Sequence, residues 1–82
     1  MDKEEIFQMI TRHICEVIPE LKDHHFQSGD SLKNLGANSI DRSEIVIMTL
    51  ESLSLKIPLI EIAGVENMGE LASILHEKLQ SR

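Results

Sequence analysis

Residues 38–53 read NSIDRSEIVIMTLESL, and the pattern of this stretch decides which fold we predict for the chain. Asn38 is a favoured N-cap residue, and Asp41 follows three positions later as a short-armed version of the capping box. We therefore expect a helix from Ser39 to about Leu53. Its apolar residues cover more of the surface than the stripe of about 100° that one core requires. The helix is then either buried on nearly every side or presents an apolar strip to a partner.

The chain before this helix predicts one more helix and a long loop. Apolar residues recur at helical spacing from Ile6 to Ile18 and share one broad face. Pro19 is expected to end that helix, because proline lacks the backbone donor that a helix interior requires. Residues 20–37 are rich in loop-forming residues, and a loop of this length is uncommon in a small domain unless it is functional.

The chain after this helix predicts a short helix and a last long one. Pro58 is favoured at the first position of a helix and Gly64 after its end, so residues 58–63 predict a short helix. Asn67 followed by Glu70 is a second capping signal and opens a helix that ends near Leu79. No strand alternation of useful length occurs. The sequence predicts an all-α bundle of three main helices and one short helix, with a long first loop, in a single domain covering residues 1–82.

Composition excludes several classes of function. Lys plus Arg number 8 against 14 Asp plus Glu, which gives a net charge of −6, so a nucleic-acid backbone would repel the protein. The chain has no run of about 18 apolar residues, and its acidic start (residues 1–5, MDKEE) is unlike a signal peptide, so we expect no membrane span. The single cysteine excludes an internal disulfide and suits a reducing cytoplasm.

No group of residues predicts a metal site or a catalytic site. The single cysteine excludes a cysteine-rich zinc site, and His24 and His25 lack a third ligand at metal spacing. Ser39 is not in a G-x-S-x-G motif and has no histidine nearby in the sequence, so hydrolase chemistry is not supported. By position alone Ser39 is a capping serine at a helix start, where the backbone N–H groups also favour a phosphate.

Residues 35–40, LGANSI, resemble the L-G-x-D-S-L motif of acyl carrier proteins. Four further segments of this chain resemble that family's pattern, in the same order and with the same spacing. They are residues 30–32 (DSL), 41–44 (DRSE), 56–58 (KIP) and 67–71 (NMGEL). The resemblance covers nearly the whole chain and implies the four-helix fold of that family.

The resemblance implies a carrier with no catalytic activity of its own. Carriers of this family receive 4′-phosphopantetheine from coenzyme A on the motif serine, here Ser39, through a magnesium-dependent phosphopantetheinyl transferase. The arm ends in a thiol that holds acyl groups as thioesters. Acidic residues of the following helix are expected to meet basic patches on partner enzymes around an apolar centre. The partner-binding residues that the resemblance implies are Asn38, Ile40, Asp41, Arg42, Ser43, Glu44, Ile47 and Glu51.

Several departures from the carriers of fatty-acid synthesis bear on the pathway. Asn38 replaces the usual aspartate before the serine, and Arg42 adds a positive charge to the recognition helix. Leu50 and Ser52 stand where the fatty-acid carriers usually have glutamates. We therefore expect a less acidic and more apolar recognition helix than in those carriers.

Residues 39–46 (SIDRSEIV) and 53–58 (LSLKIP) resemble free-standing donor carriers of bacterial polyketide β-branching cassettes. Such donors deliver an acetyl unit, made by decarboxylating malonyl, to a hydroxymethylglutaryl (HMG)-synthase-like enzyme. Acceptor carriers of these cassettes often have a tryptophan where this chain has Ile45. The partners implied are the transferase, the HMG-synthase-like condensing enzyme, and an acyltransferase and a decarboxylase of the pathway.

We expect a cytoplasmic monomer and keep two alternatives open. The chain is either a carrier in another fatty-acid or peptide assembly pathway, or an unmodified helical module that docks partners through Ile40, Ile47 and Glu44. The second alternative predicts no change of mass in any host.

Overall fold

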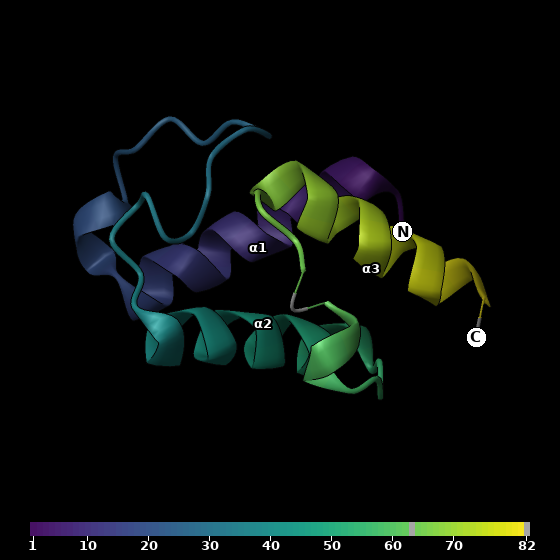
Figure 1. Cartoon of the computed structure of the whole chain (residues 1–82). Coiled ribbons are helices and arrows are strands. Elements are labelled where there is room, and N and C mark those ends of the chain that lie inside the picture. Colours follow the sequence, from purple (N-terminus) through teal and green to yellow (C-terminus); the bar gives the residue numbers. More distant parts are fainter. Residues whose placement is uncertain (63, 82) are drawn as a thin grey trace.

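The computed structural model describes residues 1–62 and 64–81 and is all-helical in that part of the chain (Figure 1). The α-helices are α1 (Lys3–Val17), α2 (Ser39–Leu53) and α3 (Met68–Ser81), and two short 3₁₀ helices are η1 (Pro19–Leu21) and η2 (Leu59–Glu61). The all-α prediction with three main helices is confirmed. No helix in the described residues is long and apolar enough to cross a bilayer.

Helices α1 and α2 both begin with a capping box. In α1 the Asp2 carboxylate accepts the Glu5 N–H at 2.8 Å, and the Glu5 carboxylate accepts the Asp2 N–H at 3.2 Å. In α2 the Asn38 side chain accepts the Asp41 N–H at 2.8 Å, and the Asp41 carboxylate accepts in return at 3.4 Å. The predicted bounds of α2 are confirmed. The box at Asp2 starts α1 at Lys3, before the predicted apolar stripe begins.

The short elements differ from the prediction. The short helix expected over residues 58–63 is a 3₁₀ helix, Leu59–Glu61, because the backbone of Pro58 is extended, with ψ at 142°, and the amides bond three residues back. Ala63, its expected last residue, lies outside the described residues. Pro19 ends α1 as predicted, but it also opens η1, where only loop was expected.

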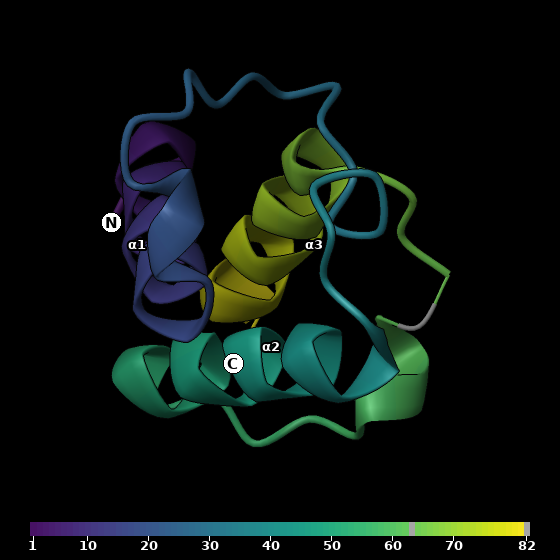
Figure 2. The same cartoon turned by 90° about the vertical axis from the view of Figure 1, so that its left-hand side faces the viewer.

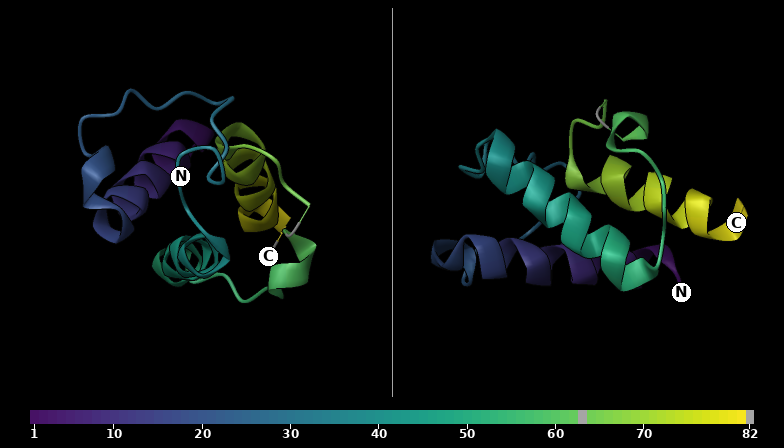
Figure 3. Two further views of the ribbon diagram at one scale, coloured as in Figure 1. Left: turned by 60° about the vertical axis from the view of Figure 1, so that its left-hand side comes forward. Right: turned by 90° about the horizontal axis from the view of Figure 1, so that it is seen from below.

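Helix α1 packs against both α2 and α3 (Figure 2). Helices α1 and α3 stand side by side (Figure 2), and α2 lies below them in Figure 1 and runs obliquely to α1 in the view from below (Figure 3, right). The largest fully buried side chains come from all three helices: Ile6, Ile10, Ile14, Ile45, Thr49, Met68, Leu71 and Leu75. This one core fixes the inner face of α2 and leaves its other face outside.

One polar cluster lies between α1 and α2. The Nδ1 atom of His13 is 2.8 Å from the Thr49 hydroxyl, which itself donates to the Ile45 carbonyl at 2.9 Å. Because the hydroxyl hydrogen is used there, the oxygen accepts from His13 Nδ1–H. The Ser52 hydroxyl lies 3.4 Å from the other ring nitrogen. Within the described residues no buried side-chain polar atom lacks a partner. These bonds fix how α1 lies along α2.

The long loop between η1 and α2 is tied to the start of α3. Met68 N–H donates to the Asp30 carbonyl at 2.8 Å, and Gly69 N–H donates to the Ser28 carbonyl at 2.9 Å. A Cβ on Gly69 would lie 2.9 Å from the Ser28 Cβ, so this close approach requires glycine. The loop therefore satisfies two of the amides that the N-terminus of α3 leaves free. Figure 2 shows it arching across to α3 before it turns down into α2.

Candidate functional site

Ser39 is displayed at the N-terminus of α2. The turn before it contains Gly36, with φ at 101°, and Ala37, which is buried and anchors the chain. A φ in this region favours glycine, so the turn is built into the sequence. The Ser39 side chain is exposed and forms no hydrogen bond within the described residues. Its hydroxyl is thus free to react, and the free amides of the first helical turn favour a phosphate beside it.

A cavity of about 500 Å³ opens beside Ser39. Apolar side chains from three parts of the chain line it: Val46 of α2, Ile62 after η2, and Met68 and Leu71 of α3. Polar and charged side chains also line it, among them Ser39, Lys33, Arg42, Ser43, Glu66 and Asn67. The cavity therefore offers an apolar wall next to a serine and two cations, in a chain that is acidic overall.

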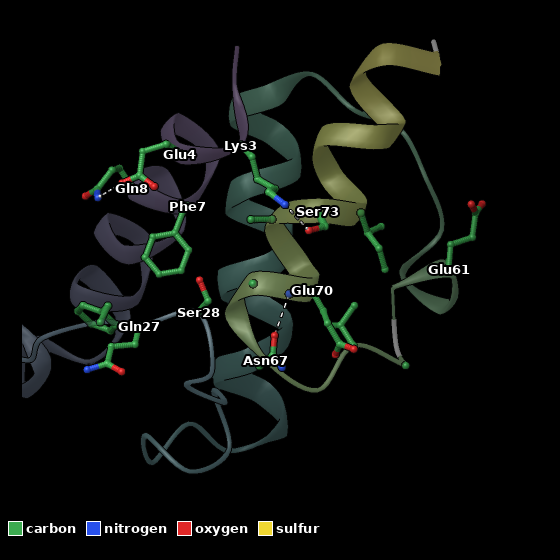
Figure 4. Close-up of a pocket in the computed structure, with 16 residues that line it drawn as sticks. Lys3, Glu4, Phe7, Gln8, Gln27, Ser28, Glu61, Asn67, Glu70 and Ser73 are labelled. Carbon is green, nitrogen blue, oxygen red and sulfur yellow. Dashed lines mark hydrogen bonds between the residues drawn. The ribbon is translucent and has the colours of Figure 1, made fainter.

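A larger and more open cavity, of about 1010 Å³, lies between the N-terminal parts of α1 and α3 (Figure 4). Both phenylalanines of the chain, Phe7 and Phe26, line it, and Lys3 Nζ donates to the Ser73 hydroxyl at 3.2 Å near its edge. Ser39 does not line this cavity. It gathers no group of reactive side chains, and it plays no part in the function proposed below.

The outer face of α2 carries most of the predicted partner-binding residues. Ile40 is 74% exposed and Ile47 is 43% exposed. The other predicted residues with exposed side chains are Asn38, Ser43, Glu44 and Glu51. Of the two arrangements that the sequence left open for α2, the structure has the exposed apolar strip.

Two predicted residues of this face turn back towards the chain before α2. Asp41 is half-buried and its carboxylate is part of the capping box with Asn38. Arg42 is half-buried and its Nη1 donates to the Ala37 carbonyl at 2.9 Å. The positive charge of Arg42 is therefore beside the serine turn rather than out on the helix surface.

Leu50 does not belong to the exposed face. It is 7% exposed and part of the core, so its contribution to a more apolar recognition surface was wrongly expected. Ser52, by contrast, is exposed. The absence of carboxylates at these two positions therefore changes the surface only at Ser52.

The sequence reasoning missed two exposed apolar side chains on η2. Ile60 is 82% exposed and Leu59 is 39% exposed, and Leu59 lines the same cavity as Ser39. The sequence shows these two residues as an apolar pair directly after Pro58. The prediction of a short helix there did not determine which of its side chains would be exposed. In the described part of the chain no three His, Cys, Asp or Glu side chains gather as a metal site would require.

Comparison with known proteins decides the family. No family model matches the chain. It is 57% identical over 81 residues to the polyketide biosynthesis acyl-carrier-protein AcpK of Bacillus subtilis (strain 168), and the alignment covers 99% of both chains. The chain belongs to the acyl carrier proteins of polyketide biosynthesis. The predicted membership of the acyl carrier protein family is thereby confirmed.

A solved structure also matches this carrier closely. It is a chain from the crystal structure of the curacin biosynthetic pathway HMG synthase in complex with acetyl donor-ACP. The TM-score is 0.91 at 45% sequence identity, and the match covers 94% of the carrier and 99% of that chain. The helical arrangement described above is therefore that of a known relative over nearly its full length.

Proposed function

We propose that this carrier holds an acetyl unit as a thioester on 4′-phosphopantetheine attached to Ser39, and delivers it to an HMG-synthase-like enzyme in polyketide β-branching. One observation supports this most strongly. The carrier is 45% identical, with a TM-score of 0.91, to a chain from a complex described as HMG synthase with acetyl donor-ACP. A match of this kind favours the donor role over a carrier role in fatty-acid or peptide assembly.

The residues around Ser39 fit the prosthetic group. The exposed hydroxyl has no hydrogen-bond partner within the described residues, and it stands where helix amides and the helix dipole favour the phosphodiester that attachment would create. When bound, the group supplies a thiol that carries the acyl unit. Attachment through a flexible arm raises the effective concentration of that unit at a docked enzyme.

The partner face of the carrier is proposed to be the outer side of α2. Exposed Ile40 and Ile47 would form the apolar centre, and the carboxylates of Glu44 and Glu51 would meet basic side chains at the rim. Charge pairs of this kind speed encounter and weaken as salt is added. Asn38 and Ser43 are the other exposed residues of this proposed face. Asp41 and Arg42 are half-buried and lie at the start of α2.

The remaining parts of the proposal concern partners and setting. The carrier would act as a single-domain monomer in the cytoplasm, without catalytic activity, and would bind neither nucleic acid nor membrane. Its further partners would be a phosphopantetheinyl transferase, an acyltransferase and a decarboxylase.

Intact mass tests the modification. The carrier is incubated with coenzyme A, magnesium and a broad-specificity phosphopantetheinyl transferase, with Ser39→Ala as the matched control. We expect a gain of one phosphopantetheine in the wild type and none in Ser39→Ala, whose helicity should match because the serine is exposed. No gain in a folded wild type would leave the unmodified docking module as the explanation.

Acetyl transfer then tests the donor role. The acetyl-loaded carrier is mixed with an HMG-synthase-like enzyme, and loss of the acetyl group from the carrier is followed by mass. Transfer to that enzyme supports the proposal. Transfer only to condensing enzymes of fatty-acid or peptide assembly would refute the donor role and keep the carrier role.

A further inference from the structure

Arg42 stands three residues after Ser39 in α2, so the two side chains are neighbours on one face of the helix. Both line the cavity of about 500 Å³. The hydrogen bond from Arg42 Nη1 to the Ala37 carbonyl, at 2.9 Å, holds the guanidinium beside the turn that presents the serine. The cation is therefore positioned, and is not free to swing across the surface.

This position is electrostatically poor for a cation. The N-terminus of a helix carries a partial positive charge, and cations are favoured at the opposite end. Arg42 is also half-buried, which removes part of its hydration. Within residues 1–62 and 64–81 the ion pairs are His24–Asp30 and Lys78–Glu61, so Arg42 has no carboxylate partner, although acidic residues outnumber basic ones by 14 to 8.

The guanidinium also has donors to spare. It carries five N–H groups, and the structure uses it for one hydrogen bond within the described residues, to Ala37. Such a planar fork matches the oxygens of a phosphate or a carboxylate and binds them through charge-assisted hydrogen bonds. Glu66 lines the same cavity and the Asp41 carboxylate belongs to the capping box, but neither forms an ion pair with Arg42 in the described residues, so the remaining donors are available to a phosphate on Ser39.

We propose that Arg42 is the built-in counter-charge of the phosphodiester on Ser39, so that attachment of phosphopantetheine tightens the first turn of α2. This inference rests on the proposed function, because Ser39 must carry the group. The phosphodiester oxygens accept from the guanidinium, and the bond to Ala37 keeps the guanidinium in place. Before modification the Arg42 guanidinium at the start of α2 has no ion-pair partner, and after modification it is paired with the phosphodiester on Ser39.

The test compares the unmodified and modified forms of four proteins by urea unfolding, once intact mass has shown that each is fully loaded. They are the wild type, Arg42→Gln, Arg42→Lys and Lys33→Gln. Lys33 lines the same cavity from the loop, but its side chain is exposed, so it is the matched control. We expect modification to raise the folding equilibrium constant of the wild type and of Lys33→Gln by about twofold to fivefold.

In Arg42→Gln that gain should fall to the part that the N-terminus of the helix supplies by itself, and Arg42→Lys should lie between Arg42→Gln and the wild type because the charge remains without the fork. In the wild type the increase in the folding equilibrium constant on modification should become smaller as salt is added. This measurement needs no variant. An equal gain in Arg42→Gln, or a wild-type gain that salt does not change, would overturn the inference alone. Failure of the wild type to be modified at all would overturn the proposed function and this inference with it.

Discussion

Helices α1 and α2 have 15 residues each and begin with the same kind of capping box, yet their outer faces differ. Every exposed side chain of α1 is polar or charged, whereas α2 exposes Ile40 and Ile47 between carboxylates. Both helices bury their inner faces in one core. Because folding needs only those inner faces, the apolar strip on α2 is available for the partner contact proposed above. The difference teaches that burial in the core accounts for the apolar residues of α1 but not for those on the outer face of α2.

The largest effect should come from the inner face of α2. Ile45 is fully buried, so Ile45→Ala removes core contacts and leaves a cavity. We expect a loss of about 2–5 kcal/mol in the free energy of unfolding, measured with urea. Ile10→Ala in α1, also fully buried, should cost a similar amount. A loss below about 1 kcal/mol in Ile45→Ala would show that α2 is less firmly packed than α1.

The outer face of α2 should behave in the opposite way. Ile47→Ala should change the free energy of unfolding by less than about 0.5 kcal/mol and weaken binding to an HMG-synthase-like partner about tenfold. Binding is measured with the phosphopantetheine-loaded carrier. The control is Glu16→Ala on the outer face of α1, which should leave binding unchanged. Equal losses in both variants would remove the distinction between the two helices.

The sequence could predict α2 and its serine because the signals there are local. The Asn38–Asp41 capping box marks the start of the helix, and the motif around Ser39 lies within a few residues of it. The end of α2 was less strongly marked. Ser54, with φ at 55°, closes the helix in a conformation usually taken by glycine.

The sequence could not say which side of α2 meets α1. Its apolar residues lie on both sides, so periodicity alone did not assign Leu50 to the core or Ile47 to the surface. The direction of Arg42 depends on the carbonyl of Ala37, which the loop fold provides. The short helix was predicted in the right place, but its 3₁₀ type was not, because proline and glycine signals mark the ends of an element but not whether its amides bond three or four residues back.

The smallest effect concerns the loop that joins α1 to α2. The backbone N–H of Gln27 and then the side chain of His24 hydrogen-bond the Asp30 carboxylate, at 2.9 and 3.1 Å, and lower its pKa. A lowered pKa in the folded state gives stability that is fully present above the ordinary value of 3.8 and is lost as the pH falls through the lowered pKa.

Acid should therefore loosen this loop slightly, and Asp30→Asn should flatten the dependence of stability on pH below about 4. The measurement is urea unfolding at a series of acidic pH values. Asp23→Asn in the same loop is the matched control, and it should retain the wild-type dependence. If the stability of both variants depends on pH as that of the wild type does, the hydrogen bonds to the Asp30 carboxylate do not contribute to the loss of stability in acid.

The packing of α1 on α3 brings the first and last helices of this fold together. During synthesis on the ribosome, α1 and α2 emerge before α3, the helix that completes their core. The loop before Ser39 is also held by amides of α3, so its final shape waits for the same helix. The bonds that the Ser28 and Asp30 carbonyls accept from the start of α3 can therefore form only after α3 has been made, and the loop takes its final shape late.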